Sequence, residues 1–338
     1  MQVVPASALS KLFAPLVELF EPLEYGKHFH KEFGPDADEV GESLPYCIEW
    51  KKGWTIFSDA LDDETRCTLL DEIRGICFRP DDDSEVSSGE LWAAEEDELF
   101  YTSEEGIWHQ FAEAIKWKRR FIPDSGVGPI SDPRAWLPQF LHKIRVFVGP
   151  KQLYHRARLG GIEEHYAVTK PYPAGDMSLP PRTRATAGRA NPAGIPYLYV
   201  AEAEMTAVSE IRPFLGGLVS VAKVRPRKNL QLVDLTKLRS IDSPFGHADL
   251  RMELEQSALL GILNRELAKP VNPALAEIEY VPTQYLAEVI LNSDYDGIRY
   301  KSAMHGGGFN VVFFDHAKLE IQEKTKLVQV ISNKLEYK

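Results

Sequence analysis

Apolar residues recur at three- and four-residue steps in the first third of the chain, a spacing that places them on one face of an α-helix. The first such stripe lies within 9–20, and a second follows Asp62 or Asp63, either of which can cap the start of a helix. A third stripe comprises Ile107, Phe111, Ile115 and Phe121. We therefore expect the N-terminal part of the chain to be mostly helical.

Beyond residue 150, runs that are rich in β-branched and aromatic residues are interspersed with amphipathic stretches. The runs are typical of strands and lie at 197–201, 219–224, 230–235, 298–301 and 309–314, with an edge strand expected at 327–331. Helical periodicity covers 206–212, 250–268 and 283–292. Because helices and strands do not alternate strictly, the pattern predicts an α+β fold.

Charge divides the chain near residue 125. Residues 1–125 contain 28 acidic and 12 basic side chains, whereas residues 126–338 contain 22 acidic and 27 basic ones. A Gly- and Pro-rich stretch follows the acidic part and is typical of a linker. We therefore predict an acidic helical domain over 1–125, a linker over 126–149 and an α+β domain over 150–338. The basic excess suits an anionic substrate, although it is also common on solvated surfaces.

Several classes of protein do not fit this composition. Three widely spaced cysteines argue against a disulfide framework or a zinc site and favour a reducing, cytoplasmic environment. No apolar run is long enough to span a membrane, and the first residues lack the cationic leader of a secretion signal. A net charge of −11 argues against general nucleic-acid binding. We expect no membrane, direct nucleic-acid partner or metal.

Known nucleotide and hydrolase motifs are absent or incomplete. The sequence has neither G-x-G-x-x-G nor a P-loop nor H-E-x-x-H. Residues 305–308 spell HGGG, the oxyanion-hole string of some esterases, but no G-x-S-x-G nucleophile elbow accompanies it. The three glycines instead predict a turn whose backbone approaches another group closely.

Three separate segments each combine a strand-like run with polar residues: 153–158, 180–213 and 295–314. Their arginines suit a pyrophosphate, because a guanidinium binds phosphate oxygens in pairs. Tyr199 on an apolar strand can stack on a flat ring. Glu210 lies in a helix whose neighbours are apolar, where a carboxylate is costly unless it has a partner. Taken singly, each arginine could also be a surface charge, and Glu210 could form a surface ion pair.

These segments resemble the RES domain, a family named for its Arg, Glu and Ser, over about residues 150–318. The resemblance rests on the strings GRANPAGIPYLY, TAVSEIRP and YKSAMHGGGFN. The family's catalytic positions correspond to Glu210, Ser302 and Tyr199. Its substrate-binding positions correspond to Arg156 with Arg158 beside it, Arg189, Asn191 and Asn310.

The resemblance implies a fold similar to diphtheria-toxin-like ADP-ribosyltransferases. It also implies a toxin or antiviral effector that degrades NAD⁺, by hydrolysis or phosphorolysis, and that is commonly paired with an antitoxin. Glu210 would bind a ribose hydroxyl and stabilise an oxocarbenium-like transition state, while the arginines bind the pyrophosphate. Tyr199 would stack near the nicotinamide, and Ser302 would orient a ribose or phosphate oxygen. The N-terminal half resembles, more weakly, the HEPN-like helical extension of longer RES proteins.

Two other functions stay open. The same site could transfer ADP-ribose to a protein, since only the acceptor differs. Alternatively, the helical half could act as a non-catalytic interaction platform. The Arg–His pair of HEPN nucleases is absent from residues 1–150. A homo-oligomer is compatible with all of these functions.

Overall fold

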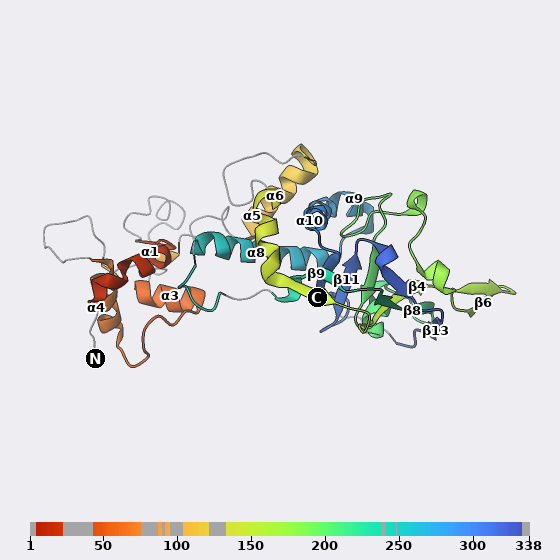
Figure 1. Cartoon of the computed structure of the whole chain (residues 1–338), viewed down its shortest axis with the longest axis horizontal. Helices are drawn as coiled ribbons and strands as arrows, with labels where there is room; N and C mark the ends of the chain where they lie inside the picture. The colour runs from red at the N-terminus through yellow and green to blue at the C-terminus, as the bar shows by residue number, and fades with distance from the viewer. Residues whose placement is uncertain are drawn as a thin grey trace. The chain divides into compact units, whose positions relative to one another are not determined.

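The computed structural model in Figure 1 describes residues 5–22, 43–75, 87–89, 92–94, 104–121, 133–237, 241–247 and 249–332. The chain divides into two compact units, each with its own hydrophobic core. Unit 1 comprises Met1–Ile107 and Arg239–Ala258, and unit 2 comprises Trp108–Leu238 and Leu259–Lys338. Neither unit is continuous in sequence, whereas the domains expected from the charge distribution are.

Unit 1 is mostly helical in its described residues. Its elements are α1 (Ser10–Val17), α3 (Leu44–Lys52), α4 (Asp63–Arg74), the first turns of α8 (Leu250–Ala268) and an antiparallel pair, β1 (Phe20–Pro22) with β2 (Trp92–Ala94). The Asp62 carboxylate caps α4 by accepting from the backbone N–H of Thr65 at 2.8 Å. One of the two predicted caps is thereby confirmed.

The core of unit 1 is formed by apolar residues of these helices, of the β1–β2 pair and of the segments between them. Phe13 and Leu16 of α1 are buried, as the predicted stripe requires, whereas Leu9 and Leu12 are exposed. The helix ends at Val17, before the end of the stripe. The buried members of this core are Phe13, Leu16, Leu19, Phe20, Leu44, Cys47, Ile48, Trp54, Leu70, Ile73, Trp92 and Leu250.

Unit 2 is built on a mixed sheet. Within the described residues this sheet has nine strands in the order β12–β8–β4–β7–β11–β10–β9–β3, and β13 also pairs with β8. Their bounds are β3 (Arg145–Val148), β4 (Tyr154–Leu159), β7 (Leu198–Ala201), β8 (Leu218–Pro226), β9 (Leu230–Asp234), β10 (Gly297–Lys301), β11 (Phe309–Phe313), β12 (Leu319–Ile321) and β13 (Lys326–Gln329). The β9–β10 pair is parallel and the other ladders of this sheet are antiparallel. A separate hairpin pairs β5 (Ile162–Glu164) with β6 (Ala167–Lys170).

Helices accompany the sheet of unit 2. They are the second part of α5 (Glu104–Glu113), α6 (Pro133–Leu141), α7 (Glu204–Glu210), the last turns of α8, α9 (Ala276–Glu279) and α10 (Val281–Asn292). Helix α6 lies inside the stretch 126–149, where the composition predicts a linker. It forms because Leu137, Phe140 and Leu141 recur at helical spacing and are buried. That stretch is therefore not a linker over its whole length.

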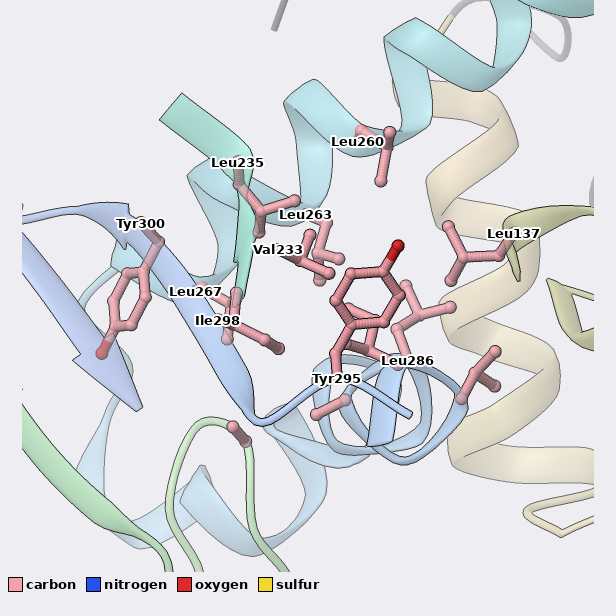
Figure 2. Close-up of a cluster of buried hydrophobic side chains, with 14 of the residues drawn as sticks. Leu137, Val233, Leu235, Leu260, Leu263, Leu267, Leu286, Tyr295, Ile298 and Tyr300 are labelled. Carbon is pink, nitrogen blue, oxygen red and sulfur yellow. The ribbon is translucent and has the colours of Figure 1, made fainter. Parts of the chain in front are cut away.

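Alternate residues of the central strands enter two different cores. On β11, Val312 belongs to one cluster, whereas Val311 and Phe313 belong to the other, as the two-residue period of a strand requires. Figure 2 shows the first cluster, which includes Leu263 of α8 and Ile298 of β10. Both faces of the sheet are thus buried at its centre.

The predicted α+β class is confirmed, and each predicted strand and helix of unit 2 has a counterpart. The predicted run at 250–268 coincides with α8. Strands β3, β5, β6 and β12, of three or four residues, did not stand out in the sequence, and β3 lies in the stretch predicted to be a linker. They are short, and β5 and β6 are largely exposed, so they show no extended apolar pattern.

Replacing Leu263 by alanine should destabilise unit 2 by about 3 kcal/mol, because the truncation leaves a cavity in a closely packed core. The side chain is 1% exposed. Urea unfolding followed by circular dichroism measures the loss. Leu291→Ala, at a position 41% exposed on α10, is the control and should change stability little. Equal losses in the two variants would contradict this packing.

Candidate functional site

The carboxylate of Glu210 is held by two side chains from a different part of the chain. Glu210 is the last residue of α7, which directly follows β7. The Ser302 hydroxyl and the Asn310 amide each donate to its Oε1 atom at 2.7 Å. Among the described residues, Oε2 has no hydrogen-bond partner. The carboxylate is therefore oriented through one oxygen, and the other is available to a ligand.

Ser302 begins the turn between β10 and β11, and its hydroxyl is fully used within the protein. Its Oγ atom accepts from the backbone N–H groups of Met304 at 3.2 Å and His305 at 3.1 Å. A serine hydroxyl has one proton and two acceptor sites. With both acceptor sites occupied, the proton is directed to Glu210. Ser302 therefore orients the carboxylate and has no capacity left for the substrate oxygen expected from the sequence.

Asn310 presents an acceptor that nothing in the described part of the protein satisfies. It lies on β11 opposite Ala201 of β7 and Tyr300 of β10, and it is 3% exposed. Its amide nitrogen donates to Glu210, while its Oδ1 atom is buried without a partner. An unsatisfied buried acceptor costs free energy, so a donor from a ligand would be favoured there.

Arg156 occupies the place where β4 and β7 separate. These strands pair at one position, His155 with Ala201. The adjacent Arg156 guanidinium donates to the carbonyls of Tyr199 at 3.0 Å and Ser178 at 3.3 Å, and its buried Nε atom finds no partner in the described part of the chain. Burial, together with the nearby charge of Arg158, lowers the pKa of Arg156 to about 10. The group remains cationic at neutral pH.

Arg158 lies two residues further along β4, on the same side of the strand. Its guanidinium donates to the Asp176 carbonyl at 2.8 Å and lies over the Tyr172 ring, 4.3 Å from the centroid. The residue is exposed, unlike Arg156. A cation stacked on an aromatic ring keeps its remaining N–H groups free for an anion.

Tyr199 and its partners hold the loop 188–191 in place. The Tyr199 hydroxyl donates to Asn191 Oδ1 at 2.8 Å and accepts from the backbone N–H of Ala190 at 2.9 Å. Its ring packs against the cluster shown in Figure 2. Burial raises the pKa of this hydroxyl, so it stays neutral. Tyr199 and Asn191 thus support the site rather than extend freely from it.

The Arg189 side chain is directed to the end of α8. It donates to the carbonyls of Leu267 and Lys269, which the helix itself leaves unpaired, and it lies near the Tyr280 ring. A cation is also favoured there by the helix dipole. In this position the guanidinium stabilises a helix end, so the structure does not show it arranged for a pyrophosphate.

Three of the predicted site residues influence the pKa of the buried Tyr300 hydroxyl. Its pKa is raised by burial, by Tyr199 and by the negative charge of Glu210, and Arg189 acts in the opposite direction. Such effects require proximity. The sequence-predicted residues Tyr199, Glu210 and Arg189 therefore lie around one buried phenol.

Of the eight residues predicted from the sequence, Glu210, Ser302 and Asn310 are in direct contact. The Arg156 guanidinium donates to the backbone carbonyl of Tyr199, and the Tyr199 hydroxyl donates to the side chain of Asn191. Sequence reasoning missed Thr206 and His305, whose Oγ1 and Nδ1 atoms are hydrogen-bonded at 2.8 Å. The string at 305–308 was the available signal, because its glycines predict a close approach.

In the part of the chain that the structure describes, no three His, Cys, Asp or Glu side chains are grouped as a metal ion would need. Within the same residues, no helix combines the length and apolarity that crossing a bilayer requires.

Comparisons with known proteins bear on unit 2. A family model for the RES domain matches residues 158–333, just over half of the chain. A chain of the M. tuberculosis MbcT–MbcA toxin–antitoxin complex is similar at 13% identity, over 57% of this chain and 91% of that chain, with a TM-score of 0.31. No curated protein sequence matches. The family match begins within β4 and does not extend to the N-terminal helices, so the HEPN-like extension stays a prediction.

Tyr300→Phe should make the protein less sensitive to alkaline pH. Because burial raises the pKa of Tyr300 in the folded chain, the unfolded chain releases this proton first, above about pH 10. The tyrosine's contribution to stability is therefore complete below pH 10 and is lost as the pH rises further. Between pH 9 and pH 11, the free energy of unfolding should fall by about 1.4 kcal/mol less in the variant than in the wild type. Urea titrations at both pH values measure this.

Tyr166→Phe is the control for that experiment, because Tyr166 is fully exposed on the β5–β6 hairpin. It should leave the pH dependence unchanged. The same pH dependence in Tyr300→Phe and wild type would mean that Tyr300 ionises as readily in the folded as in the unfolded chain.

Proposed function

We propose that this chain, which belongs to the RES-domain family, is a toxin that cleaves the nicotinamide–ribose bond of NAD⁺. The observation that most supports this function is the hydrogen bonding of the Glu210 carboxylate. Its carboxylate is oriented through Oε1 by Ser302 and Asn310, and Oε2 lacks a partner among the described residues. A fixed negative charge with one free oxygen is what an oxocarbenium-like transition state requires.

One carboxylate is sufficient for this reaction. In NAD⁺ the nicotinamide nitrogen is already cationic, so it departs as a neutral base without protonation by a general acid. The bond between C1′ and this nitrogen breaks, and its electron pair goes to the nicotinamide ring. The acceptor then forms a bond to C1′ and loses a proton. Ordinary glycosides need a second carboxylate because their leaving group must be protonated.

Glu210 would accept a hydrogen bond from a ribose hydroxyl through Oε2 and stabilise the positive charge that develops on the sugar. The unsatisfied Oδ1 atom of Asn310, adjacent to Glu210, would accept from an N–H or O–H group of the bound substrate. Together these oxygens would hold the sugar at the reacting bond.

The two arginines of β4 suit the pyrophosphate to different degrees. Arg158 is the better candidate for direct binding, because it is exposed and its stacking on Tyr172 leaves N–H groups free. Arg156 is half-buried and donates to main-chain carbonyls, so it would act mainly through its charge. Tyr199 would keep the loop 188–191 in place and support the nicotinamide side of the site.

The acceptor can be water, phosphate or a protein side chain, and the products separate these possibilities. Incubation with NAD⁺ labelled in the adenine moiety should yield free ADP-ribose with water and its 1″-phosphate with inorganic phosphate. Label that stays on protein would indicate a transferase. An antitoxin that covers Glu210 would inhibit all three reactions.

Glu210→Gln should reduce NAD⁺ consumption at least about a hundredfold, because it removes the charge that stabilises the transition state. The amide oxygen can still accept from Ser302 and Asn310, so the fold should be kept. Chromatographic measurement of NAD⁺ and nicotinamide gives the rates.

Glu204→Gln is the matched control, since Glu204 lies on the same helix and forms a surface ion pair with Lys326. It should retain wild-type turnover. A Glu210→Gln protein that consumes NAD⁺ as fast as this control would refute the mechanism.

A further inference from the structure

The turn between β10 and β11 contains the string at 305–308, which the proposed reaction does not use. The Ser302 N–H donates to the Gly308 carbonyl at 2.9 Å, and the Gly308 N–H donates to the His305 carbonyl at 3.0 Å. Gly306 and Gly307 face open space, and Gly307 has a φ of +75°. Three consecutive glycines lose much conformational entropy when they are held in one form. Packing or side-chain contacts must therefore hold this turn.

The contact that meets this need joins His305 to α7. A hydrogen bond of 2.8 Å links His305 Nδ1 to Thr206 Oγ1, and Thr206 is fully buried. A helical threonine often returns its hydroxyl to the carbonyl four residues earlier, but here the partner is the imidazole. Gly308 lies against the same threonine, since a Cβ atom at this position would stand 2.5 Å from Oγ1. The turn thus packs on Thr206 without room for a methyl group.

Thr206 and Glu210 are four residues apart on α7, so they share one face of the helix. Both reach the same turn, Thr206 through His305 and Glu210 through Ser302. The backbone N–H of His305 also donates to Ser302 Oγ at 3.1 Å. One residue therefore connects the anchor on α7 to the hydroxyl that orients the carboxylate.

We propose that His305 is a positioning residue for Glu210. Its imidazole fixes the turn against Thr206, and its N–H then holds the Ser302 hydroxyl so that the proton is directed to Oε1. Without this anchor the turn would sample other conformations, and Ser302 would orient the carboxylate for a smaller fraction of the time. The effect on catalysis rests on the proposed NAD⁺ cleavage, whereas the effect on the turn does not.

Thr206→Val and His305→Ala test the anchor, because valine keeps the shape of threonine and lacks its hydroxyl. Each should lower kcat for NAD⁺ cleavage about tenfold, because one lost hydrogen bond would leave Glu210 correctly oriented for a smaller fraction of the time, and leave KM within about twofold. The double variant should be no slower than either single one, since both remove the same interaction. Thermal unfolding verifies that each variant is folded.

His305→Asn and His305→Gln distinguish positioning from direct catalysis. An asparagine amide lies where Nδ1 does and can bond to Thr206, whereas a glutamine amide reaches the place of Nε2. The asparagine variant should keep most of the wild-type kcat, and the glutamine variant should resemble His305→Ala. The opposite order would overturn the proposal, because it would mean that Nε2 acts on the substrate. Additive losses in the Thr206→Val, His305→Ala double variant would also overturn it.

Hydrogen exchange provides a readout that does not depend on activity. The amides of Met304 and His305, which donate to Ser302, should exchange at least about tenfold faster in Thr206→Val and His305→Ala than in wild type or His305→Asn. His316→Ala, at an exposed position after β11, is the control and should change nothing. Unchanged exchange would refute the anchor. If the wild type does not consume NAD⁺, the proposed function fails, and the exchange result still decides whether His305 holds the turn.

Discussion

The site of unit 2 depends on one constraint, which is that a half-buried carboxylate needs hydrogen-bond donors in a fixed position. For Glu210 the donors are Ser302 and Asn310, which follow it by 92 and 100 residues. Asn310 faces Glu210 because β11 pairs with β7 in the register that places it opposite Ala201. A slip of one residue would turn the amide to the other side of the sheet. The register of the central strands therefore determines whether the charge is oriented at all.

Helices and strands were predictable where the local pattern of apolar residues agrees with their burial in the folded chain. Strand β11 is an apolar run that is buried on both sides, and α8 shows a helical period over its whole length, so both were visible in the sequence. Helix α6 was missed because Pro133, Pro138 and the preceding glycines are typical of a linker, although its apolar residues enter the core. That residues 239–258 belong to unit 1 could not be predicted either, because this assignment depends on contacts between residues far apart in the chain.

The identities of the site residues could be predicted, but their bonding partners could not. The resemblance to the family selects Arg156 and Arg189 as phosphate ligands, yet the guanidinium groups of both donate to main-chain carbonyls. No pattern of side chains indicates where a carbonyl will be left unpaired. One carbonyl that accepts from Arg189 is that of Leu267, which is unpaired within α8 because the helix ends there, more than seventy residues away in sequence. Ser302 and Tyr199 bond to other groups of the protein, whereas Glu210 Oε2 and Asn310 Oδ1 have no partner among the described residues and are left for a ligand.

Two of the four backbone N–H groups in the string at 305–308 are unavailable for the oxyanion hole that this string forms in some esterases. An oxyanion hole needs backbone N–H groups that are free to point at the substrate. Here the N–H of His305 donates to Ser302 Oγ and that of Gly308 to the His305 carbonyl, so both are already used. What Gly308 provides is a close approach to Thr206, with which a Cβ atom at position 308 would collide. The function of a motif thus depends on which of its polar groups remain unpaired in the folded protein. In this turn, the hydrogen bond from the His305 N–H to Ser302 serves to orient Glu210.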